Sequence, residues 1–123
     1  GKKAGLHFRH HLKALETMLT SLKEQFPAVD IYWHSGFALQ IHVPGKHKGW
    51  ENRDPLKYMS YSRSDFLYRK QMELTKKLDI PVLQFMEATY LSADHYEFGD
   101  ARHVNEKLSK RLLEWYYPNR LLQ

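Results

Sequence analysis

The stretch from Ser62 to Met86, SRSDFLYRKQMELTKKLDIPVLQFM, contains a helix pattern followed directly by a strand pattern. Apolar residues recur at helical spacing in its first part, which predicts a helix from Arg63 to Leu78 that begins after a capping serine. The apolar run Ile80 to Met86 then predicts a buried strand, in which Pro81 is tolerable only at the start. This stretch therefore predicts a helix that packs on a sheet.

The same order occurs before and after this stretch. Leu6 to Phe26 has apolar residues at steps of three and four, which is typical of an amphipathic helix, and Val29 to Trp33 is a β-branched and aromatic run that predicts a strand. After His103 a third helix is expected. Its apolar side consists of Val104, Leu108, Leu112, Trp115 and Tyr116. The predicted order is α, β, α, β, α, which favours parallel strands connected by helices.

We therefore expect an α/β fold, with a three-layer parallel sheet and flanking helices. Two strands are few for an independent sheet, since most sheets have about four to six strands. The segment 34–62 is rich in glycine, proline and polar residues and is expected to be mostly loop. Residues 1–123 are thus interpreted as a single α/β domain or as the C-terminal part of one with a larger sheet.

Composition limits the chemistry that this chain can perform. The 123 residues include no cysteine, which excludes disulfides, thiolate zinc sites and a cysteine nucleophile. No apolar run approaches the roughly 18 residues that a membrane-spanning helix needs. The formal net charge of +5 favours acidic partners, such as nucleic acid, an anionic glycan or other anionic polymer, or an acidic protein surface.

The segment Glu97-Phe98-Gly99-Asp100-Ala101-Arg102-His103 comes directly before the last predicted helix. A histidine that acts as a general base needs an acidic partner on one ring nitrogen and a hydroxyl on the other. The three-residue spacing predicts that Nδ1 of His103 donates a hydrogen bond to the carboxylate of Asp100, with Nε2 facing a cleft bordered by residues 34–45. The alternative is that Asp100 caps the last helix and His103 is solvated in its first turn.

An Asp-x-x-His loop that is followed at once by a closing amphipathic helix resembles the final block of SGNH/GDSL-type hydrolases. The stretches DIYWHSGFALQIH (30–42) and YMSYSRSDFLYRKQMELTKKLDIPVLQFMEATYLSADHYEFGD (58–100) are similar in layout to the PC-esterase/NXPE-like branch. The resemblance implies that Asp100 and His103 are catalytic and that His42 and Asn105 contact the substrate. It also implies a secretory-lumen or extracellular location.

The chain departs from that family at the nucleophile. It contains no Gly-Asp-Ser block, and the loop where the oxyanion hole is expected reads His34-Ser35-Gly36. Ser35, beside Gly36 at a strand end, is the best placed of the serines for a nucleophile within the chain and is assigned to the substrate site, with a turn hydroxyl as the alternative. The expected source of the nucleophile is a missing N-terminal segment or another protein chain.

Other constellations in the sequence are weaker. Eight histidines include His7, His10 and His11 at helical spacing, but no His-Glu-x-x-His pattern accompanies them, so neither a metal site nor a cofactor is expected. Basic and aromatic residues alternate from Lys57 to Lys70. Such a surface can stack bases or sugars, although aromatic residues half-buried against the sheet explain the same pattern.

Three functions remain open from the sequence. The first is an SGNH-like esterase or acyl-transfer module that acts on glycan or other O-acyl esters and is incomplete without its nucleophile block. The second is a non-catalytic structural or binding subunit derived from this fold within a larger assembly. A weaker third is a basic module that binds nucleic acid or an anionic glycan.

Overall fold

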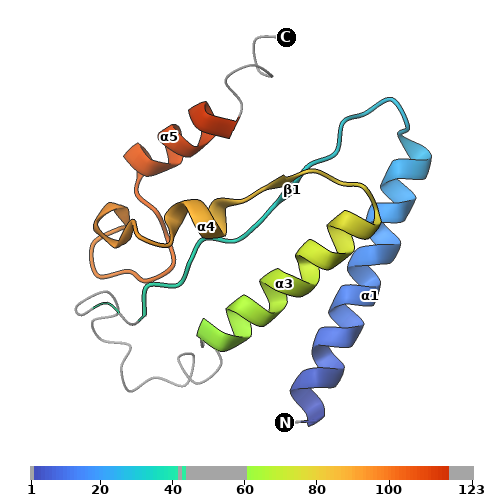
Figure 1. Cartoon of the computed structure of the whole chain (residues 1–123), viewed down its shortest axis with the longest axis horizontal. Coiled ribbons are helices and arrows are strands. Elements are labelled where there is room, and N and C mark those ends of the chain that lie inside the picture. The colour runs from blue at the N-terminus through green and yellow to red at the C-terminus, as the bar shows by residue number, and fades with distance from the viewer. Residues whose placement is uncertain (1, 42, 44–60, 117–123) are drawn as a thin grey trace. The chain divides into compact units, whose positions relative to one another are not determined.

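The computed structural model describes residues 2–41, 43 and 61–116, and within these ranges the chain has mixed α/β structure (Figure 1). Four α-helices, one short 3-10 helix and two short strands are present in this part of the chain. They are α1 (Lys2–Gln25), β1 (Trp33–His34), α3 (Tyr61–Lys77), β2 (Val82–Leu83), α4 (Phe85–Thr89), η1 (Ala93–His95) and α5 (Glu106–Tyr116). None of the helices in the described ranges has the length and apolar character that crossing a membrane requires.

β1 and β2 form a two-stranded parallel sheet. The backbone N–H of Trp33 donates to the carbonyl of Pro81 at 2.9 Å, and two residues later Ser35 donates to Leu83 at 3.1 Å. Both partners advance in the same direction, as parallel pairing requires. The predicted parallel pairing of these two segments is confirmed.

The predicted strands were too long. Residues 29–32 lie outside β1, which begins only at Trp33, and the chain after Leu83 turns into α4 instead of continuing as a strand to Met86. The hydroxyl of Ser35 accepts the backbone N–H of Met86 at 2.9 Å, so a contact across 51 residues satisfies one of the free N–H groups in the first turn of α4. That contact accompanies the early end of β2.

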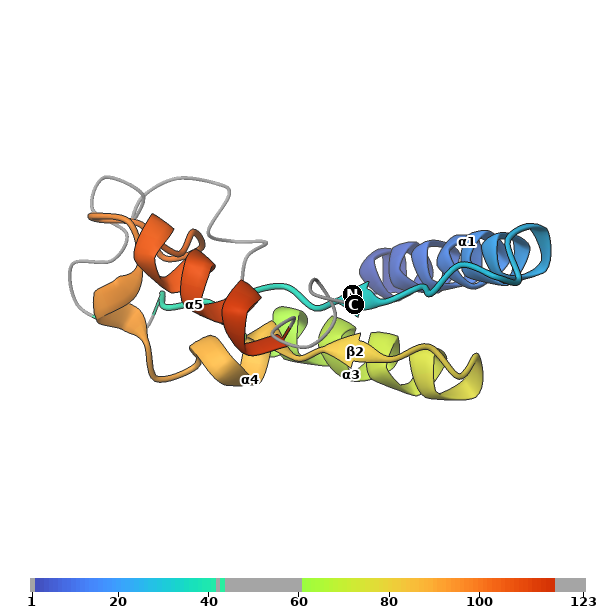
Figure 2. The ribbon, with the colours of Figure 1, turned by 90° about the horizontal axis from the view of Figure 1, so that it is seen from above.

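The described chain divides into two compact units, unit 1 (Gly1–Trp33 and Asp65–Val82) and unit 2 (His34–Ser64 and Leu83–Gln123). In unit 1, α1 and α3 lie side by side (Figures 1 and 2). The rings of Phe8 and Phe66 are 5.7 Å apart, and further along both helices Lys23 donates to the carbonyl of Leu78. The two helices therefore run in the same direction.

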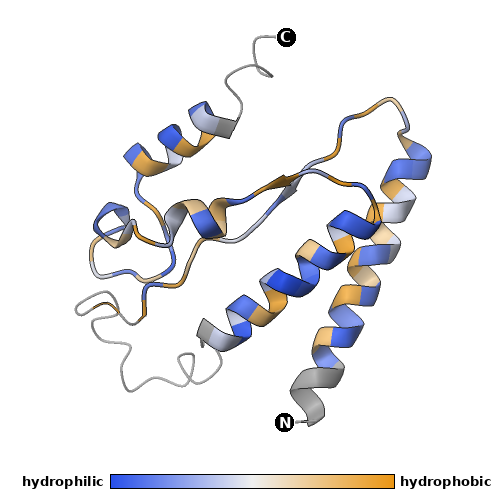
Figure 3. Ribbon diagram, viewed as in Figure 1, coloured by the Kyte–Doolittle hydropathy of each residue, from blue (hydrophilic) through white to orange (hydrophobic). Residues whose placement is uncertain are grey.

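The core of unit 1 is apolar. Both helices show alternating apolar and polar residues in Figure 3, as expected for amphipathic helices. The buried residues of this core are Leu15, Leu19, Leu74 and Ile80, and the partly buried Ile31, Trp33 and Leu78 pack against them. Full burial of each such side chain is worth about 1.5–3 kcal/mol.

α3 ends in a Schellman motif. The N–H of Ile80 donates to the carbonyl of Thr75 at 2.8 Å, and the N–H of Asp79 donates to the carbonyl of Lys76 at 3.2 Å. Asp79 occupies the left-handed position of this motif, with φ of 55°. Glycine is the usual residue there, because an L side chain is strained at positive φ.

Unit 2 contains a buried network of polar groups in addition to buried apolar side chains such as Phe85 and Leu112. The side-chain amide of Gln40 donates to the carbonyls of Thr89 and Tyr90 at 2.9 and 3.1 Å. The hydroxyl of Thr89 accepts the N–H of Ala38 at 2.9 Å, and Tyr96 donates its hydroxyl proton to the carbonyl of Ala38. These contacts hold residues 38–40 against the region of α4. Burial raises the pKa of Tyr96, although hydrogen bonds with Thr89 and Gln40 act in the opposite direction.

Candidate functional site

The Asp100–His103 segment lies in a closed loop of unit 2. Tyr96 and Val104 form an antiparallel bridge at its base. Next to this bridge, Glu97 donates its N–H to the carbonyl of His103 at 2.9 Å. At the tip, the N–H of Asp100 donates to the carbonyl of Glu97 at 3.0 Å, and Gly99 has a φ of 69°. Positive φ at the third residue of a four-residue turn is typical of a type II turn and favours glycine.

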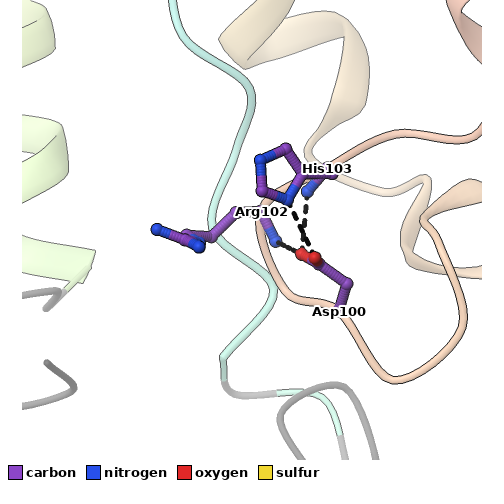
Figure 4. Close-up of polar contacts among 3 residues, drawn as sticks. All are labelled: Asp100, Arg102 and His103. Carbon is purple, nitrogen blue, oxygen red and sulfur yellow. Dashed lines mark hydrogen bonds and ion pairs between the residues drawn. The ribbon is translucent and has the colours of Figure 1, made fainter.

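Asp100 accepts three hydrogen bonds within this loop (Figure 4). Its Oδ1 atom accepts the backbone N–H groups of Arg102 at 2.6 Å and His103 at 2.9 Å. Its Oδ2 atom lies 2.8 Å from Nδ1 of the His103 ring. The two backbone bonds orient the carboxylate, and the oriented carboxylate in turn positions the imidazole.

The hydrogen bonds also affect the ionisation of Asp100. Partial burial is the largest single influence and opposes the charged form. The backbone N–H of Arg102, the His103 side chain and the N–H of His103 together outweigh it, so the pKa of Asp100 is lowered from its usual value of 3.8. The group is therefore a carboxylate at neutral pH.

The carboxylate determines which ring nitrogen of His103 carries a proton in the neutral imidazole. A carboxylate only accepts hydrogen bonds, so the 2.8 Å contact places a proton on Nδ1. In the neutral ring Nε2 then carries a lone pair, and in Figure 4 that nitrogen lies on the side of the ring away from Asp100. The His103 side chain is 61% exposed, whereas that of Asp100 is 29% exposed. A reactant can reach Nε2 from solvent.

The helix-cap alternative for Asp100 is wrong. α5 begins at Glu106, and its capping residue is Asn105, whose Oδ1 accepts the N–H of Leu108 at 2.9 Å. Asp100 lies five residues earlier and bonds to its own loop. The structure assigns this cap to Asn105, the residue for which the family resemblance implied a contact with substrate.

Ser35 is completely buried, with an exposed fraction of 0%. Its hydroxyl accepts the N–H of Met86 and donates to the carbonyl of Gly36 at 3.2 Å. Both contacts are to backbone, and within the described ranges no hydrogen bond connects Ser35 to Asp100 or His103. His42 lies outside the described residues, as do positions 44 and 45 of the expected cleft, so both stay predictions.

Two features of unit 2 were not anticipated from the sequence. Phe98, at the second position of the tip turn, is 94% exposed and directly precedes Gly99 and Asp100. His34 packs the edge of its ring on Phe85, with ring centres 4.1 Å apart. The order Phe-Gly-Asp in the sequence is typical of a turn and could have predicted an exposed residue there. The contact of His34 with Phe85 joins segments 51 residues apart, so no local pattern predicts it.

No group of three or more metal-binding side chains occurs within the part of the chain that the structure describes. The Asp100–His103 site combines an imidazole with an oriented carboxylate, a pair suited to proton transfer.

Comparisons with protein-family models, with curated proteins and with solved structures each return no match to this chain.

Proposed function

We propose that Asp100 and His103 are the acid/base pair of an SGNH-like esterase or acyl transferase that acts on O-acyl esters, of glycans or of other acceptors. The observation that carries this proposal is the 2.8 Å contact between Asp100 Oδ2 and His103 Nδ1 on an exposed imidazole. A lowered Asp100 pKa supports it, because the partner of the base has to stay ionised while the imidazole becomes cationic.

In this mechanism Nε2 of His103 takes the proton of a nucleophilic hydroxyl. The hydroxyl oxygen forms a bond with the acyl carbon, and the carbonyl electron pair moves onto the carbonyl oxygen. When the carbonyl re-forms, the bond to the alcohol oxygen breaks, and that oxygen takes the proton from Nε2. Water, or an acceptor hydroxyl in a transferase, repeats both steps and releases the acyl group. Asp100 stabilises the imidazolium at each stage without taking the proton.

The proposal places the nucleophile in an N-terminal segment outside these residues or in another protein chain. The same segment would add strands to the β1–β2 pair and complete a three-layer sheet with helices on both faces. A secretory-lumen or extracellular location also belongs to this proposal, since O-acylated glycans are the substrates that the resemblance implies.

A serine-directed fluorophosphonate tests the proposal on the natural protein that carries this chain. We expect covalent labelling of a serine, and we expect His103→Ala to slow the labelling by several orders of magnitude, since loss of the base removes activation of the hydroxyl. His95→Ala is the matched control, because His95 is also an exposed histidine of unit 2. The proposal fails if no serine is labelled or if the two variants react at the same rate.

A second candidate, a non-catalytic binding or structural subunit, is favoured by the two backbone bonds to Asp100 Oδ1. They give the carboxylate a role in the shape of the loop that needs no catalysis. Circular dichroism and thermal unfolding of His103→Ala separate the two functions. If the chain is a non-catalytic subunit, His103→Ala alters stability or partner binding, and the unchanged protein has no esterase activity.

A further inference from the structure

Unit 1 contains a hollow of about 180 Å³ on the side where the chain enters both strands. Its lining comes from the end of α1, from the segment that leads into β1 and from the segment between α3 and β2. The aromatic and charged residues of this lining are Phe26, Tyr32, Lys23, Asp30 and Asp79. This volume is below the roughly 300–1,000 Å³ of sites for drug-sized ligands, so one side chain is a better match than a cofactor.

The hollow combines apolar walls with acidic groups. Pro27, Val29, Ile31 and Pro81 line it together with the aromatic rings of Phe26 and Tyr32. Phe26 is 50% exposed and Val29 is 59% exposed, so apolar surface continues from the hollow to its rim. An exposed apolar surface around a concave site is typical of a protein interaction surface.

The charges around the hollow favour a cation. Asp30 and Asp79 are both exposed, and neither has an ion pair with another side chain within the described ranges. Lys23 is the basic residue of the lining, and its ammonium group donates to the carbonyl of Leu78. The lining therefore has two carboxylates and one ammonium group, and the ammonium group already has a hydrogen-bond acceptor.

We propose that this hollow binds an arginine side chain of a protein partner. A guanidinium group stacks on aromatic rings and pairs with carboxylates through several N–H donors, and its aliphatic stem covers apolar surface. Arginine is also enriched at protein interfaces and among the residues that dominate their binding energy. The proposal does not involve Asp100 or His103, and it holds whether or not the chain is part of an esterase.

Titration of the chain with acetyl-Gly-Arg-Gly-amide tests the proposal by ¹H–¹⁵N NMR. We expect shifts at the backbone amides of residues 29–32 and at those of Asp79 and Ile80. The same peptide with citrulline keeps the shape of the side chain without its charge. The citrulline peptide cannot form the two exposed ion pairs, which are worth about 0.2–1 kcal/mol each. We therefore expect it to bind about two- to thirty-fold more weakly than the arginine peptide.

Asp30→Asn and Asp79→Asn test each carboxylate separately. Asparagine tolerates positive φ, so the second variant keeps the end of α3 intact. Each change is expected to weaken binding of the arginine peptide by about 1.4- to five-fold, and more at 20 mM salt than at 500 mM salt. Asp94→Asn, an exposed aspartate of unit 2, is the control and should have no effect.

Three results would overturn the proposal. The first is that the shifted amides lie outside residues 29–32 and 79–80. The second is that the citrulline peptide binds as well as the arginine peptide. The third is that both aspartate variants bind like the unchanged chain, while circular dichroism shows them to be folded.

Discussion

The two units of this chain both bury apolar side chains, but they differ in the buried hydrogen bonds that join distant segments, which are concentrated in unit 2. Unit 1 packs apolar side chains of α1 and α3 into one cluster, and its charged groups lie on the surface. Unit 2 buries Gln40, Thr89 and Ser35 almost completely and satisfies them with backbone groups from distant parts of the chain. Apolar packing tolerates changes that conserve volume, whereas a buried hydrogen-bond network specifies one arrangement of its loops. The loop that carries Asp100 and His103 belongs to the second kind.

The largest expected effect follows from Leu19→Ala in unit 1. Leu19 is 3% exposed, and its truncation removes apolar contacts and leaves a cavity, at a cost of about 2.7–5 kcal/mol in the free energy of unfolding. Urea denaturation measures this loss. Met18→Ala is the control, since Met18 is 49% exposed and should cost far less. Leu112→Ala in unit 2, where Leu112 is also 3% exposed, is expected to cost a similar amount. A much smaller loss would show that unit 2 depends on its buried hydrogen bonds more than on apolar packing.

A threonine pair compares the hydroxyl groups of the two units directly. Thr89→Val removes an acceptor for the N–H of Ala38 and a donor to the carbonyl of Phe85, at 2.9 and 2.6 Å. The orphaned N–H predicts a loss of about 1–3 kcal/mol. Thr75→Val in unit 1 is the matched control, because the Thr75 hydroxyl donates only to carbonyls of its own helix. Equal losses of urea-measured stability in the two variants would contradict a special role for the network of unit 2.

The third prediction concerns Asp100 and pH. Its folded-state pKa is lowered, so the stability that it provides is present above pH 3.8 and is lost as the pH falls through the lower folded-state value. Asp100→Asn keeps a neutral acceptor for Arg102 and His103 and is expected to cost about 0.5–1.5 kcal/mol at pH 7. The difference from the unchanged chain should shrink as the pH falls below 3.8 and through the lower folded-state pKa. A difference that stays constant from pH 7 to pH 3 would show that the charge of Asp100 does not contribute.

Local patterns in the sequence predicted what local interactions determine. The first two helices were expected at Leu6 to Phe26 and Arg63 to Leu78 and lie at Lys2–Gln25 and Tyr61–Lys77, because helical periodicity is a property of neighbouring residues. The bond between Asp100 and His103 was predictable for the same reason, since three residues separate them. The sequence could not predict α4, because an apolar Phe85-Met86 fits a strand as well as a helix.

Contacts between distant segments account for most of what the sequence did not predict. Ser35 binds the N–H of Met86, and Gln40 binds the carbonyl of Thr89 across 49 residues. No spacing rule marks such partners in a single sequence. The same argument applies to the hollow of unit 1, which residues 23–32 and 79–81 form together. The proposed role of His103 in a reaction would also depend on a nucleophile that local patterns do not reveal.

The smallest expected effect compares one backbone position in each unit. Asp79 and Gly99 both have positive φ, at 55° and 69°. Asp79→Gly relieves strain at the end of α3 and should stabilise unit 1 by up to about 1 kcal/mol, although the added freedom of the unfolded chain reduces this gain. Gly99→Ala should destabilise unit 2 by about 1 kcal/mol through strain alone, since a Cβ atom there meets nothing within 4 Å. Thermal unfolding of both variants measures the pair. If Asp79→Gly instead destabilises the chain, the aspartate side chain makes a contribution to the fold that outweighs its strain. In that case the contribution of Asp79 to stability would be enough to explain an aspartate at this position, without the binding of a cation.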